Sequence, residues 1–137
     1  MPPTKPGWKT DLSQEEAEAG MNLKLKRVYE PSDKNDGTRI LVDRLWPRGM
    51  TKAKAGVDIW LKELAPSAEL RKWFGHDPDK WTEFKKRYRA ELEENDEQLA
   101  RLREEIKKGA VTLLYGAKDE EHNDAVALAE FLRDQKK

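Results

Sequence analysis

Residues 110–115, Ala-Val-Thr-Leu-Leu-Tyr, decide the fold class, because this continuous apolar run lies between two segments of helical spacing. The segment 95–109 repeats leucine and isoleucine three or four residues apart and closes at Gly109. The segment 123–132 repeats alanine and leucine with the same spacing. A short apolar strand between two helices is typical of parallel sheets whose faces are covered by helices. The sequence therefore predicts an α/β protein.

Further strands and helices are expected on the N-terminal side of this run. Alternating apolar and charged residues predict an edge strand over 23–29, and an uninterrupted apolar run predicts a fully buried strand over 39–43. A half-exposed strand is expected over 57–62. Ser67 and the Asp77-Pro78 pair are typical helix starts, which predicts helices over 67–74 and 77–92.

Length and composition limit the number of domains and the class of protein. The chain has 137 residues and no cysteine, and 39% of its residues are charged. We expect one small layered domain over 22–137, with a short, mostly parallel sheet of about four strands flanked by helices, and an N-terminal extension over 1–21. No apolar run is long enough to span a membrane, and no secretory signal is recognisable, so a cytoplasmic location is expected.

The charges are distributed unevenly, although their sum is zero. Residues 22–89 carry a net charge of +7 and residues 90–137 carry −5. Such asymmetry can mark an anion-facing surface. The alternative is that the two regions mix on the folded surface and their fields cancel.

The first polar cluster follows the strand predicted over 39–43, at the end where parallel sheets bind ligands. The loop 43–50 reads Asp-Arg-Leu-Trp-Pro-Arg-Gly-Met. Arg44 and Arg48 can each fork onto a phosphate or carboxylate, and Gly49 lets backbone N–H groups approach an anion. Trp46 offers a flat wall. The alternative is structural: Arg44 would pair with the preceding aspartate, and Trp46 would belong to the core.

The second cluster follows the strand over 110–115. Tyr115 ends the strand, and Lys118, Asp119, His122 and Asn123 then precede a helix N-terminus, which favours anions. We predict that Tyr115, Lys118 and Asp119 face the same ligand as the first cluster. Helix capping explains Asn123 fully and competes with a functional role for His122.

Candidates for proton transfer are few. His122 can act as a general acid or base at neutral pH, and Asp43 is the other candidate catalytic residue. His76 lies between two helices and is a minor candidate. Two histidines without cysteine make a poor metal site, so no metal is expected, and the sequence indicates no cofactor. Glycine-rich phosphate loops and the nucleophile elbow of hydrolases are absent from the sequence.

Three blocks carry a resemblance to a known family: Arg39-Ile-Leu-Val-Asp-Arg-Leu-Trp-Pro-Arg-Gly49, Trp60-Leu-Lys-Glu-Leu-Ala-Pro-Ser67 with Glu69-Leu-Arg71, and Val111-Thr-Leu-Leu-Tyr-Gly-Ala-Lys-Asp119 with His122-Asn123. Together they resemble the YeaO-like branch of domain-of-unknown-function family 488, over roughly residues 26–132. The resemblance implies a compact bacterial or archaeal α/β protein without an established activity. It also supports one pocket shared by the two strand ends.

The chain departs from the broader family at the second strand end. That family has a Cys, then a Pro and a Cys-His-Arg stretch, where this chain has Tyr115 and Glu121-His122-Asn123. Only His122 corresponds, so the resemblance does not imply a thiol-based activity.

The leading hypothesis is a pocket for a small anionic ligand at the strand ends formed by 43–50 and 115–123; whether it catalyses a reaction stays open. One alternative is a nucleic-acid-binding module, and another is a protein-partner-binding module that uses the charged helices and the extension. No membrane contact is expected, and the sequence does not indicate the oligomeric state. The nucleic-acid surface would use Arg44, Lys52, Lys54, Lys85, Lys86 and Arg89.

Overall fold

The computed structural model describes residues 22–135, so the extension predicted over 1–21 lies outside the described residues. In chain order the strands and α-helices are β1 (Leu23–Arg27), β2 (Thr38–Leu41), α2 (Lys52–Ala55), β3 (Ile59–Trp60), α3 (Ala68–Phe74), α4 (Trp81–Glu93), α5 (Asp96–Lys108), β4 (Val111–Tyr115) and α6 (Asp124–Gln135). Three short 3-10 helices lie at Lys34–Asp36, Lys62–Leu64 and Pro78–Lys80.

The four strands form one parallel sheet in the order β1-β4-β2-β3. The apolar run that decided the fold class is β4, and it lies in the middle of the sheet: Leu113 pairs with Leu25 on one side and with Ile40 on the other. All five residues of β4 are buried, as the run of apolar residues predicts. The predicted α/β class and mostly parallel sheet are confirmed, and the strand predicted over 23–29 is indeed at an edge.

The helices follow local capping signals. The Ser67 hydroxyl accepts the N–H of Leu70, and Gly75 ends α3 in the left-handed conformation. α4 begins at Trp81 rather than at Pro78, because the Asp77 carboxylate accepts the N–H of Asp79 and closes a separate 3-10 turn first. The short helix α2 was not predicted; the Thr51 hydroxyl starts it, and it ends before it can present an amphipathic face.

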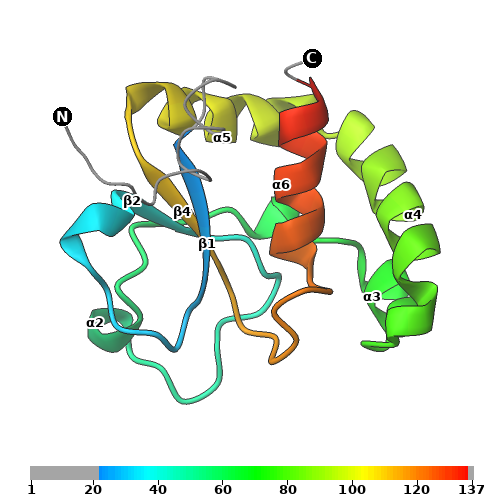
Figure 1. Ribbon diagram of the computed structural model, residues 1–137, viewed down its shortest axis with the longest axis horizontal. Helices are drawn as coiled ribbons and strands as arrows, with labels where there is room; N and C mark the ends of the chain where they lie inside the picture. Colours follow the sequence, from blue (N-terminus) through cyan, green and yellow to red (C-terminus); the bar gives the residue numbers. More distant parts are fainter. Residues whose placement is uncertain (1–21, 136–137) are drawn as a thin grey trace, which may run out of the picture.

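The sheet separates two hydrophobic clusters of unequal size. The larger cluster joins β1, β2 and β4 to α3, α4, α5 and α6, and contains Phe74, Phe84 and Tyr88. The smaller one contains Val28, Leu41, Ala55 and Leu114. Figure 1 shows α4 and α6 to the right of the strands and α2 to the left. The long helices therefore cover one face, and the loop that follows β2 covers the other.

Candidate functional site

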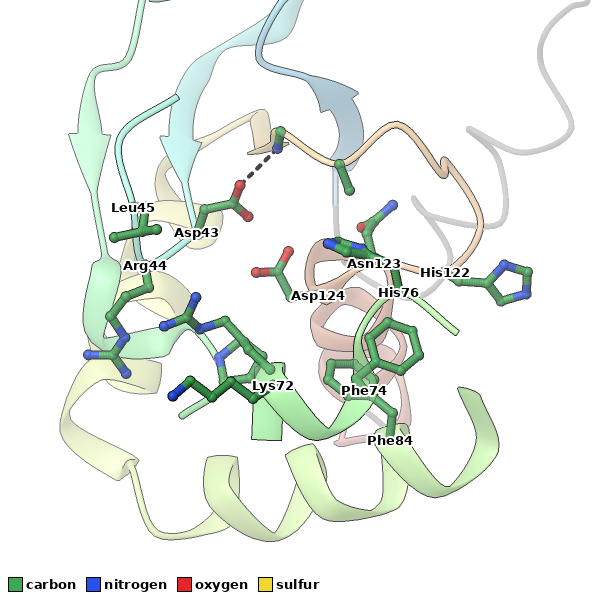
Figure 2. A pocket seen from close by; sticks show the side chains of 14 residues that line it. Asp43, Arg44, Leu45, Lys72, Phe74, His76, Phe84, His122, Asn123 and Asp124 are labelled. Carbon is green, nitrogen blue, oxygen red and sulfur yellow. Dashed lines mark hydrogen bonds between the residues drawn. The ribbon is translucent and has the colours of Figure 1, made fainter. Parts of the chain in front are cut away.

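A pocket of about 430 Å³ lies at the carboxyl ends of β2 and β4, which is where parallel sheets place ligands (Figure 2). The loop after β2, helix α3 with the turn that follows it, and the N-terminus of α6 form its sides. The lining residues are Asp43, Arg44, Leu45, Pro66, Arg71, Lys72, Phe74, His76, Phe84, Gly116, Ala117, His122, Asn123 and Asp124.

Asp43 is fixed by the two central strands. It follows β2 directly, and its Oδ2 accepts the N–H of Gly116, at the end of β4, at 2.8 Å. A side chain at Gly116 would place its Cβ 3.3 Å from that oxygen. Glycine at this position therefore avoids a tight contact with the carboxylate. The Arg27 guanidinium donates to the carbonyls of Gly116 and Ala117 and holds the loop in place. The strand ends thus set the position of this carboxyl group.

Asp43 and Asp124 are neighbouring carboxyl groups that both line the pocket, and they influence each other's pKa. Burial raises the pKa of Asp43, despite its hydrogen bonds from Asp124 and Gly116. Burial raises the pKa of Asp124 well above its usual value, and the charge of Asp43 raises it further. Two adjacent carboxylates repel each other strongly where solvent screens them poorly, so the ionisation of both groups is unfavourable. The pair therefore keeps a proton to higher pH than an ordinary aspartate does.

This raised pKa has a consequence for stability. The folded protein keeps a proton that the unfolded chain releases, so the free energy of unfolding falls as pH rises from 3.8, the usual value for aspartate, through the raised pKa of Asp124. We expect Asp124→Asn to stabilise the protein near pH 8 by roughly 1–2 kcal/mol, the size of one relieved unfavourable interaction. The gain should disappear near pH 4. Urea unfolding at both pH values measures it, and a gain that is equal at both would contradict the shared proton.

Two arginines line the pocket without partners for part of their guanidinium groups. The Nε atoms of Arg44 and Arg71 are buried and have no hydrogen-bond partner. Lys72 lies beside them, and in residues 22–135 none of these three cations forms an ion pair. A buried N–H without an acceptor costs about 1–3 kcal/mol. With a proton on the carboxyl pair, the pocket carries an excess of positive charge.

The helix start at Asn123 serves a structural purpose and also closes one side of the pocket. The Asn123 Oδ1 accepts the N–H of Val126 at 2.9 Å, which confirms the predicted cap. The His122 Nδ1 lies 2.9 Å from Asp119, and its ring packs edge-on against Trp81. His76, between α3 and the next turn, has a φ of 58°, and its backbone turn brings it to the pocket wall.

Of the residues predicted in the first cluster, the structure brings Asp43 and Arg44 to the pocket and places the others elsewhere. The Trp46 N–H donates to the carbonyl of Met50, and its half-buried ring packs against the smaller hydrophobic cluster and edge-on against the ring of Trp60. Arg48 is exposed, and Gly49 has open space around it. The structural alternative describes Trp46 correctly, but the described residues show no ion pair between Asp43 and Arg44.

The second cluster is divided in the same way. His122 lines the pocket. Tyr115 is 4% exposed and packs in the larger hydrophobic cluster. Lys118 is exposed on the loop. Asp119 accepts the N–H groups of Glu121 and His122, and these hydrogen bonds lower its pKa. Asp119 therefore organises the turn before α6 outside the lining of the pocket.

Sequence reasoning missed Arg71, Lys72 and Asp124 as site residues. Arg71 stands in a block that carries the family resemblance, but the sequence gives no reason to fold α3 over the strand ends. Asp124 looked like an ordinary acidic residue in a first helical turn. Within residues 22–135 no three His, Cys, Asp or Glu side chains are grouped to hold a metal ion. Nor is any helix in that range long and apolar enough to cross a membrane.

Comparison with known proteins gives a family match and close relatives. A family model described as "Inactive DUF488-N3 subclade" matches residues 22–137. The uncharacterized protein YeaO of Escherichia coli K12 is 47% identical over 113 residues, which cover 82% of this chain and 98% of YeaO. The uncharacterized protein Rv3073c of Mycobacterium tuberculosis H37Rv is 41% identical over 110 residues, 80% of this chain and 92% of the relative. No solved structure gives a significant match.

Proposed function

Because the chain belongs to the inactive DUF488-N3 subclade, we propose that it binds a small organic anion at the strand ends without transforming it. The observation that carries this proposal is the pair of buried Nε atoms of Arg44 and Arg71 without an acceptor. Buried polar groups are nearly always hydrogen-bonded, and an unpaired one calls for a missing partner. A carboxylate or phosphate group is the partner that matches a guanidinium.

The rest of the pocket fits a ligand with an anionic head and an apolar body. Leu45, Pro66 and Ala117 line it together with the rings of Phe74 and Phe84. A cavity of about 430 Å³ lies in the usual size range of small-molecule sites, and such sites combine apolar walls with a few polar groups. Figure 2 shows the head groups of Arg44 and Lys72 together at one side of this space.

The nucleic-acid alternative has less support, because carboxylates offset much of the basic surface of α4. Lys85 pairs with Glu130 and Arg89 with Asp134, both on α6. The uneven charge of the sequence thus mixes on these two neighbouring helices. Non-specific binding to nucleic acid depends on unpaired basic groups along a phosphate backbone.

A thermal-shift panel tests the anion site. The probes are phosphate, sulfate, acetate, benzoate and phenyl phosphate, with a short DNA duplex as the nucleic-acid probe. A bound probe at about 100 times its Kd adds about 2.7 kcal/mol, a rise of several degrees in Tm. We expect a rise with an organic anion that is lost in Arg44→Ala and in Arg71→Ala, while both variants remain folded.

Arg48→Ala is the matched control, because Arg48 is an exposed arginine of the same loop outside the pocket. It should keep the full shift. An equal loss of the shift in the Arg48 variant would indicate a diffuse surface effect. A panel in which only the duplex binds would overturn the proposal.

A further inference from the structure

The pocket contains opposite charges that do not pair with each other. Figure 2 shows the head groups of Arg44 and Lys72 on one side and the carboxyl groups of Asp43 and Asp124 on the other, and Arg71 also lines the pocket. Within residues 22–135 no ion pair joins the two groups. Lys72 is exposed, but Arg44, Arg71 and the two aspartates are half-buried, and the Nε atoms of both arginines are buried. Removing a charged group from solvent without a partner is costly, and where the fold buries charges completely, as at Arg39 and Asp36, it pairs them.

We infer that the ligand is a small zwitterion of the amino acid class, whose carboxylate binds Arg44 and Arg71 and whose ammonium group binds Asp43 and Asp124. This inference rests on the proposed function and narrows it to one class of ligand. A zwitterion supplies an acceptor to the unpartnered guanidinium Nε atoms and a cation to the carboxyl pair. A simple anion supplies the acceptor but no cation for the carboxyl pair.

Binding of the ammonium group must displace the proton that the carboxyl pair holds. The ammonium group keeps its own three hydrogens and donates them to the two carboxylates, and the displaced proton goes to solvent. Affinity for the zwitterion therefore rises with pH through the titration of the pair. Affinity for a simple anion falls as pH rises, because the protonated carboxyl pair repels the anion less than the ionised pair does.

Other titratable and charged groups face the carboxyl pair from each neighbouring element. Arg71 and His76 lower the pKa of Asp43 through their charge, and the Tyr88 hydroxyl of α4 feels the charges of both carboxyl groups. The groups facing the pair are Arg44 after β2, Arg71, Lys72 and His76 from α3 and its end, Tyr88 from α4, and His122 before α6. His76 and His122 both line the pocket with the carboxyl pair, so variants must separate their effect from that of the pair.

The apolar wall selects among amino acids. The ring of Phe74 stacks on that of Phe84 with centroids 4.3 Å apart, and both line the pocket. This surface suits an aliphatic or aromatic side chain and gives a side-chain cation no partner. We therefore expect apolar amino acids to bind more tightly than lysine.

The experiment compares molecules that share one body and differ in charge. Calorimetric titrations at pH 7.5 use L-phenylalanine, 3-phenylpropionate and 2-phenylethylamine, and a second set uses L-leucine, 4-methylpentanoate and 3-methylbutylamine. We expect the amino acid of at least one set to bind about tenfold or more tightly than either analogue, since each charged contact contributes at least ~1.4 kcal/mol. Its affinity should rise with pH through the titration of the carboxyl pair.

Variants identify the groups responsible. Asp124→Asn should abolish the preference for the ammonium group and flatten the pH dependence, while 3-phenylpropionate still binds. Asp119→Asn is the matched control, because Asp119 lies next to His122 but outside the pocket, and it should keep both properties. A pH dependence that survives Asp124→Asn would assign it to His76 or His122 and overturn the carboxyl pair as the ammonium site.

The two proposals fail in different ways. If the carboxylates bind as tightly as the amino acids, or more tightly at low pH, the zwitterion is wrong and the anion site stands. If no amino acid and no anion binds, both are wrong.

Discussion

Gly37→Ala is expected to destabilise the protein by about 2–6 kcal/mol, because overpacking and backbone strain each cost roughly 1–3 kcal/mol. Gly37 has a φ of 65° and a ψ of −140°, a region that side chains rarely adopt. A Cβ at this position would lie 2.6 Å from the carbonyl carbon of Ala110. The same carbonyl accepts the N–H of Thr38, where β2 joins β4, so the backbone cannot move aside without breaking the sheet.

Gly49→Ala separates strain from collision. Gly49 also has a positive φ, 80°, but nothing lies within 4 Å of a Cβ built there. Gly49→Ala should lower the free energy of unfolding by about 1 kcal/mol, which is the cost of the backbone conformation alone. Urea unfolding of the three proteins measures the difference, and equal losses in the two variants would show that the approach to Ala110 is not what matters.

Asp36→Asn has the second-largest expected effect, a loss of about 3–5 kcal/mol, because it leaves a buried cation without its counter-ion. The Arg39 guanidinium lies 2.6 Å from the Asp36 carboxylate, and each side chain is 4% exposed. Lys26 donates to the same carboxylate. The other hydrogen bonds of the Arg39 guanidinium go to the carbonyls of Ala55 and Gly56, which tie β2 to the end of α2.

The control for this variant is a carboxylate–guanidinium ion pair that is exposed to solvent. Glu83 and Arg87 are 2.9 Å apart on α4, and about half of each side chain is exposed. Glu83→Gln should change the free energy of unfolding by less than about 1 kcal/mol. If both variants lose the same amount, burial is not the source of the effect.

Asp36 also makes the free energy of unfolding depend on pH in the acidic range. Burial alone would raise the pKa of Asp36, but the hydrogen bonds from Lys26 and Arg39 outweigh it and the pKa lies below 3.8. Stability from this carboxylate is therefore present above pH 3.8 and is lost as pH falls through the lowered value. The difference in the free energy of unfolding between wild type and Asp36→Asn should narrow only below pH 3.8.

Local signals determined most of the elements, and for that reason they could be predicted. The runs that became β2 and β4 are apolar throughout because both faces of a central parallel strand are covered. Ser67 and Gly75 mark the ends of α3 in sequence and in structure. β3 is shorter than predicted: after Trp60 the chain donates once more to β2, from the N–H of Leu61, and then turns into a 3-10 helix.

The site could be predicted only where the strand ends determine it. Asp43 and Arg44 were found because a residue that follows a central parallel strand must lie at that edge of the sheet. Arg48 lies four positions further along a loop whose path depends on Trp46 packing against Trp60, which no local pattern indicates. Arg71 enters the pocket through the packing of α3, a tertiary contact that sequence periodicity does not describe.

The strand order also determines when the protein can fold. Within residues 22–135, β4 is the last strand and pairs with both β1 and β2, so β1 has no partner in this sheet until Val111 reaches Leu23. Pairings between distant segments pay the loop-closure cost before they gain contacts, which slows folding. On the ribosome, β1 must wait with its edge unpaired until β4 has emerged. Asp124 arrives later still, so a nascent chain has neither the central strand nor the complete pocket until residues 111–124 have been made.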